Sequence, residues 1–571
     1  MITDILHYKR DMKRVVDLLV RQLITINRRS RAISLKMSSM FSFFSIREAV
    51  GIFSILIVAF FIRAVILNLR PFQSDESIYV YASYAITRGV VPYREIYLAH
   101  PPLMYAIYSV FIQLVGPDFI RIRLLNVLTY LVTVFLVYTM ARMLLKNHKG
   151  NHTFALLSAA IYAFYPSNFL LISIASLLEN VLTSLTLGVV IVYISYRESK
   201  NKWLLFSAGI LMGLALITTL RAVIFVMSMA LFHVLSCLWG KKYKDTFRDV
   251  VIAFIGTLVP ALVVILTAVY WEALPQLYLQ LVYRQMIRPY QESRLFHLFL
   301  YINSMIPLIV TGVLGAIYSA RIAKREKRSS LVLPIFVYAT TFLALTFAFP
   351  NTFLQYFFHL NPYLAFLSVM CFFQVKTVLK ACGFIKTKMR LDQNLTLLSI
   401  FLVLLILLSF QKLDSFKEKE MPYFRQTPYN SLHFYVGNSV ATVSEPNDKI
   451  WTSEGAIAFF AQRLIVAPNS SSWPVHTHFS AIFGFTSSDS KKQFAQTLVT
   501  PEQFVEAWEK EKVKVIVFIR GSGWVPYPDE LLWNGFKGQE GTASYIEEKY
   551  ELRLVVRSTN VPYSYFVWVR K

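Results

Sequence analysis

Residues 51–77 read GIFSILIVAFFIRAVILNLRPFQSDES, an apolar run that ends in two adjacent carboxylates, Asp75 and Glu76. The apolar part is about 20 residues long, which is the length that an α-helix needs to cross about 30 Å of hydrocarbon. The stretch therefore predicts a membrane helix that is followed within a few residues by an acidic segment.

The composition of the chain indicates that this helix is one of many. Of the 571 residues, 56% are hydrophobic and 15% are aromatic, so the chain is too apolar for one soluble globule and long enough for a membrane bundle plus a further domain. Apolar runs of spanning length recur about eleven times. They cover roughly residues 48–68, 123–145, 153–173, 180–196, 203–220, 222–240, 250–271, 298–320, 331–349, 356–376 and 393–410.

The charges predict how these helices are oriented. The formal net charge is +25, and nearly all of the positive excess precedes residue 411. The basic residues lie in short clusters between alternate apolar runs, as in LKNHKGN, YRESKNK and ARIAKREKRSS. Because basic loops stay on the cytoplasmic side, the N-terminus is predicted to be cytoplasmic and everything after residue 410 extracytoplasmic. Clusters of this kind orient membrane helices, and they argue against binding to nucleic acid.

Three regions follow from this pattern. Residues 1–46 are predicted to be a basic cytoplasmic segment, residues 47–410 a transmembrane domain whose first external loop covers residues 69–122, and residues 411–571 an extracytoplasmic domain. In the last region the helix-like EGAIAFFAQR and PEQFVEAWEKEKVK alternate with the strand-like IWTSE, LIVAP and VIVFI, which is typical of an α/β fold. The predicted fold class is a polytopic α-helical membrane protein of about eleven spans with a C-terminal α/β domain.

One short apolar segment stands outside this count. The segment PPLMYAIYSVFIQLVG, residues 101–116, could cross the membrane, but a crossing there would move every later basic loop to the other side. We therefore expect a helix that lies along the outer surface.

The first external loop gathers side chains that can perform acid–base chemistry at the membrane surface. Ser74 can cap a helix that starts with Asp75 and Glu76, and acids suit the dipole of a first turn, so capping alone would explain them. Phenols and charged groups follow, namely Tyr79, Arg88, Tyr93, Arg94, Glu95 and His100. A carboxylate that takes a proton from a hydroxyl, beside cations that stabilise a departing phosphate, suits sugar transfer from a lipid phosphate. The vestibule of a transporter would carry the same residue types.

The order of motifs in this region resembles a known group. An apolar helix, then DE, then PYREIYLAHPPL, then GPDFIRIRLLNVL resembles the start of the protein O-mannosyltransferase and lipid A aminoarabinose transferase group, which are glycosyltransferases of the C superfamily. The resemblance covers the membrane region and is most specific over residues 70–130. It implies a GT-C type fold, an acidic site in the first external loop, and polyprenyl-phosphate sugars as donors.

The resemblance also implies roles for individual residues. Asp75 matches the leading carboxylate of the group, so Asp75 and its neighbour Glu76 are expected to be catalytic. Glu179, in SIASLLEN, resembles a second carboxylate that faces the same cavity, with a helix cap as the alternative. His100 stands where the aminoarabinose branch has a phosphate-binding lysine, so it is either a phosphate contact or a structural histidine.

The remaining expected site residues come mostly from later loops. Arg221 follows a GLA pattern, near where relatives place a basic residue, and is expected to bind the donor phosphate or to mark the membrane boundary by snorkelling. Arg88 and Arg284 are the other candidates for contact with the phosphate. The substrate cavity is expected to be lined by Tyr79, Tyr93, Tyr356 and His359.

These features predict an inverting membrane glycosyltransferase that moves a sugar from a dolichyl- or undecaprenyl-phosphate donor to a protein, glycan or lipid acceptor at the outer face of the cell membrane. No metal and no cofactor are expected, because the sequence has no DxD motif, and a lipid-phosphate donor lacks the diphosphate that nucleotide-sugar enzymes commonly clamp with a metal. The alternative is a transporter or flippase of lipid-linked glycans, although no convincing internal repeat supports it. A bundle that only anchored a C-terminal binding module would need far fewer spans.

Overall fold

The computed structural model describes residues 46–67, 74–96, 98, 100–148, 150–165, 178–239, 243–283, 294–326, 328–347, 354–381, 432–452, 455–466, 501–521, 533, 541–557 and 563–571. The chain divides into two compact units, Met1–Ile55 and Leu56–Lys571. The described part of the first unit is the start of helix α2 (Ile46–Ile66), and every later element belongs to the second unit. The predicted span 393–410 lies outside the described residues, as does the predicted cytoplasmic segment apart from residue 46.

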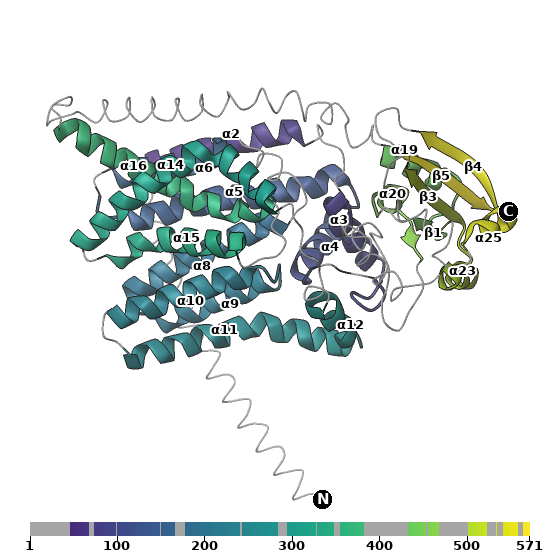
Figure 1. Cartoon of the computed structure of the whole chain (residues 1–571), viewed down its shortest axis with the longest axis horizontal. Helices are drawn as coiled ribbons and strands as arrows, with labels where there is room; N and C mark the ends of the chain where they lie inside the picture. The colour runs from purple at the N-terminus through teal and green to yellow at the C-terminus, as the bar shows by residue number, and fades with distance from the viewer. Residues whose placement is uncertain are drawn as a thin grey trace, which may run out of the picture. The chain divides into compact units, whose positions relative to one another are not determined.

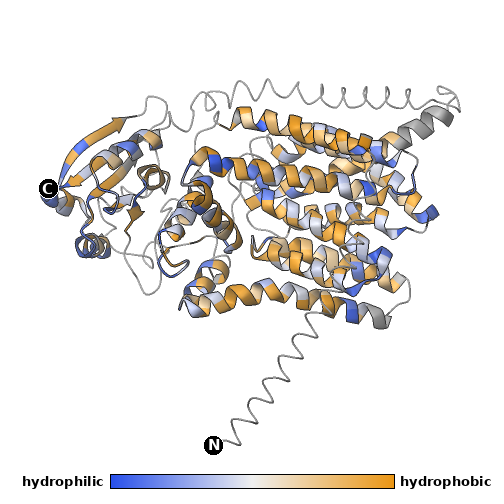
Figure 2. Cartoon of the chain, turned by 180° about the vertical axis from the view of Figure 1, so that it is seen from behind, coloured by the Kyte–Doolittle hydropathy of each residue, from blue (hydrophilic) through white to orange (hydrophobic). Residues whose placement is uncertain are grey.

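Long helices make up most of the described chain before residue 382, and Figure 1 shows those from α5 onward side by side. After α2 they are α5 (Phe119–Leu144), α6 (Asn151–Phe164), α8 (Leu178–Ser199), α9 (Lys202–Leu216), α10 (Ala222–Trp239), α11 (Tyr243–Tyr270), α14 (Arg294–Glu326), α15 (Leu333–Phe347) and α16 (Asn361–Ala381). Apolar residues, orange in Figure 2, predominate along these helices. Large apolar side chains such as Phe254 and Leu262 of α11 stay exposed, which fits a surface that faces lipid.

Six of the described helices are long and apolar enough to cross a membrane. Their apolar stretches are Glu48–Val65, Phe119–Leu144, Leu178–Ser199, Thr246–Tyr270, Leu295–Glu326 and Ser329–Phe347. The shorter apolar helices are Leu103–Val115, Lys202–Leu216 and Ala222–Leu238. The chain is therefore a mostly helical, multi-pass membrane protein, and each predicted span up to 356–376 overlaps a helix.

Two pairs of bundle helices touch backbone to backbone at a glycine. Between α9 and α11, a Cβ on Gly209 would lie 2.2 Å from the carbonyl oxygen of Ala253. Between α14 and α16, a Cβ on Gly315 would lie 1.7 Å from the carbonyl oxygen of Leu367. Membrane helices approach this closely only where a small residue leaves room, so larger side chains at these two positions would force the helices apart.

Two short helices, α3 (Ser74–Thr87) and α4 (Leu103–Val115), occupy the predicted first external loop and pack against each other. Helix α4 has 13 residues, fewer than the about 20 that a spanning helix needs. Every side chain of α3 from Glu76 to Ala85 is buried, because small residues such as Ala82 and Ser83 let neighbouring elements approach.

Short turns link the later helices. They are α12 (Leu274–Tyr278), the π-helical turn η1 (Leu279–Tyr283), and the 3-10 turns η2 (Ser329–Val332) and η3 (Leu354–Leu360). Turn η3 leads directly into α16, and η1 follows α12 without a break. Single π-helical turns often occur at functional sites.

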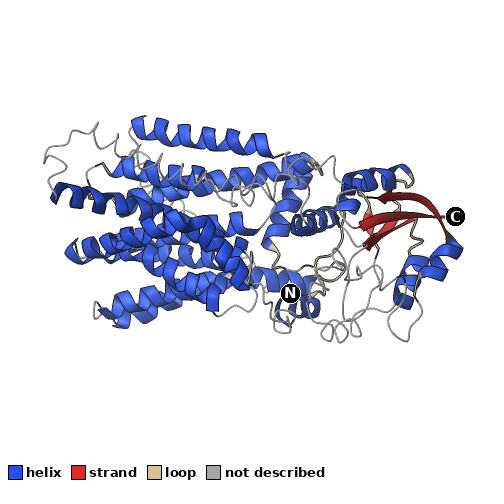
Figure 3. Ribbon diagram, turned by 45° about the horizontal axis from the view of Figure 1, so that its top comes forward, coloured by secondary structure: helices blue, strands red, loops and turns tan. Residues whose placement is uncertain are grey.

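The C-terminal region contains nine described elements. They are α19 (Leu432–Thr442), β1 (Lys449–Thr452), α20 (Gly455–Ala461), β2 (Leu464–Ile465), α23 (Pro501–Lys510), β3 (Val515–Gly521), α25 (Ala543–Lys549), β4 (Tyr550–Arg557) and β5 (Tyr563–Arg570). The strands form one sheet in the order β2-β1-β3-β5-β4, drawn in red in Figure 3. Strand β1 pairs in parallel with β2 and β3, and β5 pairs antiparallel with β3 and β4.

Aromatic side chains fill the core of this C-terminal region. The ring of Trp451 on β1 lies 5.9 Å from the ring of Phe504 and 5.4 Å from that of Trp508, both on α23. Phe518 on β3 lies 5.0 Å from the same tryptophan. Buried aromatic pairs of this kind stabilise a fold beyond the area they bury, so α23 is held firmly on the sheet.

Candidate functional site

Glu76 lies in the first turn of α3 and forms an ion pair with Arg123 of α5. Arg123 Nε donates to Glu76 Oε1 at 2.8 Å, and Arg123 Nη2 donates to Glu76 Oε2 at 2.7 Å. Both side chains are 0% exposed. Arg123 Nη1 donates to the carbonyl oxygen of Leu67 at 2.8 Å, and the guanidinium lies over the ring of Phe119. The pair therefore ties α3 to α5 and to the end of α2.

Asp75 directly precedes Glu76 in the same helical turn. Its side chain lies outside the described part of the structure, so its predicted catalytic role stays a prediction. Asp75 belongs to the same helical turn as Glu76, which Arg123 binds. Both carboxylate oxygens of Glu76 accept hydrogen bonds from Arg123, which suits a residue that positions the helix.

Arg221 joins three segments that are far apart in the sequence. Its Nη2 lies 3.3 Å from Oε1 of Glu179, at the start of α8. Its Nε donates to Oγ1 of Thr219 at 3.2 Å, and its Cζ lies 3.4 Å from the ring centre of Tyr356 in η3. The side chains of Glu179 and Arg221 are only 4% and 11% exposed. Three predicted residues, Glu179, Arg221 and Tyr356, are thus brought together.

A second group of predicted residues lies beside the first. The ring of Tyr79 on α3 is centred 5.6 Å from the ring of His100 and 5.8 Å from that of Tyr105. The hydroxyl of Tyr93 donates to the carbonyl oxygen of His100 at 3.0 Å. Tyr79 lies close enough to Arg221 for the two to interact electrostatically. Tyr79 therefore connects helix α3 to the arginine.

His359 belongs to the same neighbourhood. It is buried in η3, three residues after Tyr356, and it interacts electrostatically with Arg221. The backbone joins the two groups as well, because the N–H of Leu103 donates to the carbonyl oxygen of Ile217 at 3.0 Å. The start of α4 is thereby attached to the turn that carries Arg221.

Gln280, which the sequence analysis did not single out, shapes the loop between α3 and α4. Its Nε2 donates to the carbonyl oxygen of Tyr93 at 2.8 Å, and its Oε1 accepts from the N–H of Leu98 at 2.9 Å. Arg94 also donates to the carbonyl oxygen of Trp271 at 3.1 Å. A glutamine in an apolar stretch, LYLQLVY, is the only sequence signal for this role.

Two predicted phosphate contacts are not brought to the site by any described contact. Arg88 is exposed just beyond the far end of α3, about 20 Å along the helix axis from Asp75 at about 1.5 Å per residue. Its backbone N–H donates to the carbonyl oxygens of Tyr84 and Ala85, and its charge acts on Tyr84. Arg284 lies outside the described residues.

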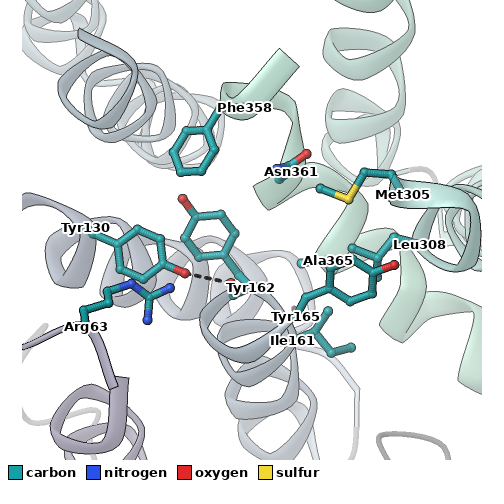
Figure 4. A pocket seen from close by; sticks show the side chains of 10 residues that line it. All are labelled: Arg63, Tyr130, Ile161, Tyr162, Tyr165, Met305, Leu308, Phe358, Asn361 and Ala365. Atoms are coloured by element: carbon teal, nitrogen blue, oxygen red, sulfur yellow. Dashed lines mark hydrogen bonds between the residues drawn. The ribbon is translucent and has the colours of Figure 1, made fainter. Parts of the chain in front are cut away.

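A small pocket opens inside the bundle, and none of the residues that line it was predicted from the sequence (Figure 4). Its volume of about 20 Å³ is enough for a single water molecule. Arg63 of α2 lies over the ring of Tyr130, with its Cζ 3.6 Å from the ring centre, and Tyr130 donates to the carbonyl oxygen of Tyr162 at 2.8 Å. An arginine within an apolar run was the signal that could have found this site.

Comparison with known proteins finds a match in sequence over part of the chain. Residues 99–271 match the family model described as "Dolichyl-phosphate-mannose-protein mannosyltransferase". No curated protein sequence matches the chain.

Solved structures share the fold over most of the chain. ArnT from Cupriavidus metallidurans bound to undecaprenyl phosphate has a TM-score of 0.55 and 13% identity, and the match covers 91% of this chain and 97% of that one. The Archaeoglobus fulgidus oligosaccharyltransferase tethered with an acceptor peptide has a TM-score of 0.50 and 12% identity, over 91% of this chain and 74% of that one. The predicted resemblance is therefore confirmed for the fold, and over residues 99–271 for the sequence.

Proposed function

We propose that the chain transfers a sugar, with inversion, from a polyprenyl-phosphate donor to a protein, glycan or lipid acceptor at the outer face of the membrane. The observation that carries this proposal is Arg221, a largely buried cation that is oriented by Glu179 and Tyr356. A family model named for an enzyme of dolichyl-phosphate-mannose and a similar fold with bound undecaprenyl phosphate support the class of donor.

Arg221 is the proposed contact for the donor phosphate. Its Nε and Nη2 are engaged by Thr219 and Glu179, whereas its Nη1 makes no hydrogen bond within the described part of the chain. The contact to Glu179 is 3.3 Å, longer than the about 2.7–2.9 Å of a strong charge-assisted hydrogen bond. The guanidinium is therefore held in one orientation while Nη1 can still donate a hydrogen bond. A phosphate oxygen would accept from Nη1.

The proposed reaction needs one base. An acceptor hydroxyl attacks the anomeric carbon of the sugar, its proton passes to the carboxylate of Asp75, and the bond from the anomeric carbon to the phosphate oxygen breaks. The electron pair leaves on the polyprenyl phosphate, where Arg221 stabilises the charge that develops. Tyr79 and Tyr93 contact His100, and we assign these residues and His359 to the substrate cavity, while Glu76 holds the turn of Asp75 through Arg123.

The proposal includes an orientation for the chain. About eleven spans would place the N-terminal segment in the cytoplasm and the C-terminal α/β domain outside, because basic loops remain cytoplasmic. The first external loop and the turn that carries Arg221 would then lie on one side. A cysteine-accessibility scan tests this orientation: Arg321 to Arg328 should be labelled only from inside, and the C-terminal domain only from outside.

Transfer is tested with purified protein, radiolabelled polyprenyl-phosphate sugars and a panel of acceptors. We expect Asp75→Asn to lower turnover by about 10²-fold or more, since the base is lost. Asp448→Asn is the matched control, because Asp448 lies in an exposed turn of the C-terminal domain and should retain wild-type turnover. Undiminished transfer by Asp75→Asn would remove Asp75 from the mechanism. Movement of a lipid-linked glycan across liposomes without any transfer would favour the transporter instead.

A further inference from the structure

We propose that the corner between α20 and β2 in the C-terminal domain positions α3, with Tyr81 and Tyr84 as the positioning residues. The inference deepens the proposed function, because α3 begins with the carboxylate that would act as base. It assigns to the C-terminal domain a role in placing that base, in addition to any contact with the acceptor.

Two tyrosine hydroxyls of α3 reach the backbone of this corner. The hydroxyl oxygen of Tyr81 accepts from the N–H of Ile465 at 2.7 Å, and the hydroxyl of Tyr84 donates to the carbonyl oxygen of Gln462 at 3.0 Å. The ring of Tyr84 also meets Phe459 of α20 edge to face, with ring centres 6.0 Å apart. Tyr81 and Tyr84 are 2% and 4% exposed, and both hydrogen bonds are partly buried.

The corner that receives the tyrosines is itself fixed. Gln462 has a positive φ of 53°, which non-glycine residues adopt only where surrounding contacts hold them. Arg463 supplies such contacts, since its Nη1 donates to the carbonyl oxygen of Ala461 at 2.9 Å and its Nη2 to that of Ser444 at 2.6 Å. The carbonyl group that accepts from Tyr84 is therefore held in place by the C-terminal domain.

The other sides of α3 are held by the membrane region. Glu76 is bound to Arg123, and the hydroxyl of Ser109 on α4 donates to the carbonyl oxygen of Ser83 at 3.1 Å. Apolar packing alone tolerates small shifts along a helix, whereas hydrogen bonds fix direction and register. The helix is thus secured at its start by the bundle and along its second half by the C-terminal domain.

The test uses the double variant Tyr81→Phe/Tyr84→Phe, which removes both hydrogen bonds and keeps both rings. Tyr435→Phe is the matched control, because Tyr435 is 57% exposed on the neighbouring helix α19. We expect the double variant to lower kcat about tenfold, as two net hydrogen bonds no longer hold the base, with the KM for the donor unchanged within about twofold. The control should match the wild type in both.

Hydrogen exchange separates failure of this inference from failure of the proposed function. Amides of Ser77 to Val80 should exchange faster in the double variant, while those of α8 keep their wild-type rates, whether or not transfer is observed. Phe459→Leu loosens the contact with Tyr84 from the side of α20. It should also lower kcat and speed the exchange of α3, and it replaces the double variant if that variant does not fold. Wild-type exchange of α3 in these variants, or faster exchange spread equally over α8, would overturn the inference.

Discussion

Two buried glutamate–arginine pairs in this protein differ in how many hydrogen-bond donors of the arginine are engaged by the described residues. In the pair Glu76–Arg123 both side chains are 0% exposed, two short hydrogen bonds join them, and Arg123 gives its remaining nitrogen to the carbonyl oxygen of Leu67. In the pair Glu179–Arg221 one contact of 3.3 Å joins the side chains. All three guanidinium nitrogens of Arg123 are thus engaged, whereas Nη1 of Arg221 makes no hydrogen bond among the described residues; we call the first pair closed and the second open.

The difference shows how one combination of residues serves two purposes. A closed, fully buried pair fixes the elements that carry it, and its removal is costly because one unpaired charge stays behind. In an open pair the arginine is held by a weaker contact, so its removal should lower the free energy of unfolding less. A bound anion would supply the remaining stabilisation of the cation. Stability measurements and kinetics should therefore separate the two pairs.

The largest effect is expected for the closed pair. Arg123→Met leaves the carboxylate of Glu76 buried without its partner, and we expect a loss of about 3–5 kcal/mol in the free energy of unfolding. Thermal unfolding in detergent measures this loss. Glu76→Leu/Arg123→Met removes both charges and should recover most of the stability. A single variant as stable as the wild type would show that the pair does not secure α3.

Arg221→Gln should affect catalysis more than stability. We expect kcat/KM for the lipid donor to fall about 10²–10³-fold, because a donor aimed at the departing phosphate is lost, with a melting temperature within a few degrees of the wild type. Arg553→Gln, at a site 58% exposed on β4, is the control. A loss of stability as large as that of Arg123→Met would contradict an open pair.

Glu179→Gln should have an intermediate effect. The amide oxygen can still accept from Arg221, but the hydrogen bond loses its charge assistance, so we expect kcat to fall about tenfold. Glu179→Ala, which removes the acceptor altogether, should lie between this variant and Arg221→Gln. Steady-state kinetics with one donor concentration series measures both. Equal rates for the two glutamate variants would mean that Glu179 does not orient the arginine.

The smallest effect belongs to a third, exposed pair, Arg94–Glu95, whose side chains are 38% and 40% exposed. Partial burial raises the pKa of Glu95, but hydrogen bonds from the N–H of Val91 and from Arg94 outweigh it, and the net pKa is lowered from 4.5. The stabilisation that ionised Glu95 contributes is fully present above its ordinary pKa. It is lost as the pH falls through the lower pKa that Glu95 has in the folded state. It should stay below about 1 kcal/mol.

Hydrogen exchange at Val91 as a function of pH measures this effect. Protection in the wild type should fall in acid below pH 4.5, and Glu95→Gln should remove that pH dependence. Glu551→Gln, which alters another exposed pair, on β4, is the control. A pH response that persists in Glu95→Gln would assign the titration to another group.

The parts of the fold that depend on local sequence could be predicted. Apolar length determines where a bundle helix lies, so the predicted runs before residue 382 coincide with helices. Glu179, Arg221 and Tyr356 were predicted from motif resemblance, and the structure brings them together.

The contacts between distant residues could not be predicted, because no local pattern encodes them. Glu76 binds Arg123, which is 47 residues further along the chain, and Tyr81 contacts Ile465, which is 384 residues further along. Gln280 shows no pattern that marks it as the partner of Tyr93. Pairings of this kind depend on how elements pack, and hydropathy and charge do not determine that packing in advance.

The two hydrogen bonds of Gln280 have a consequence for how this protein can be altered. Gln280 recognises a carbonyl group at Tyr93 and an N–H at Leu98, groups that nearly every amino acid would present there. Gln280 therefore holds the loop through its backbone at these two points, while Arg94 and Glu95 between them add side-chain contacts to Trp271 and Val91. A substitution at Arg94 or Glu95 would remove one of these side-chain contacts, while the two hydrogen bonds of Gln280 to the backbone would remain.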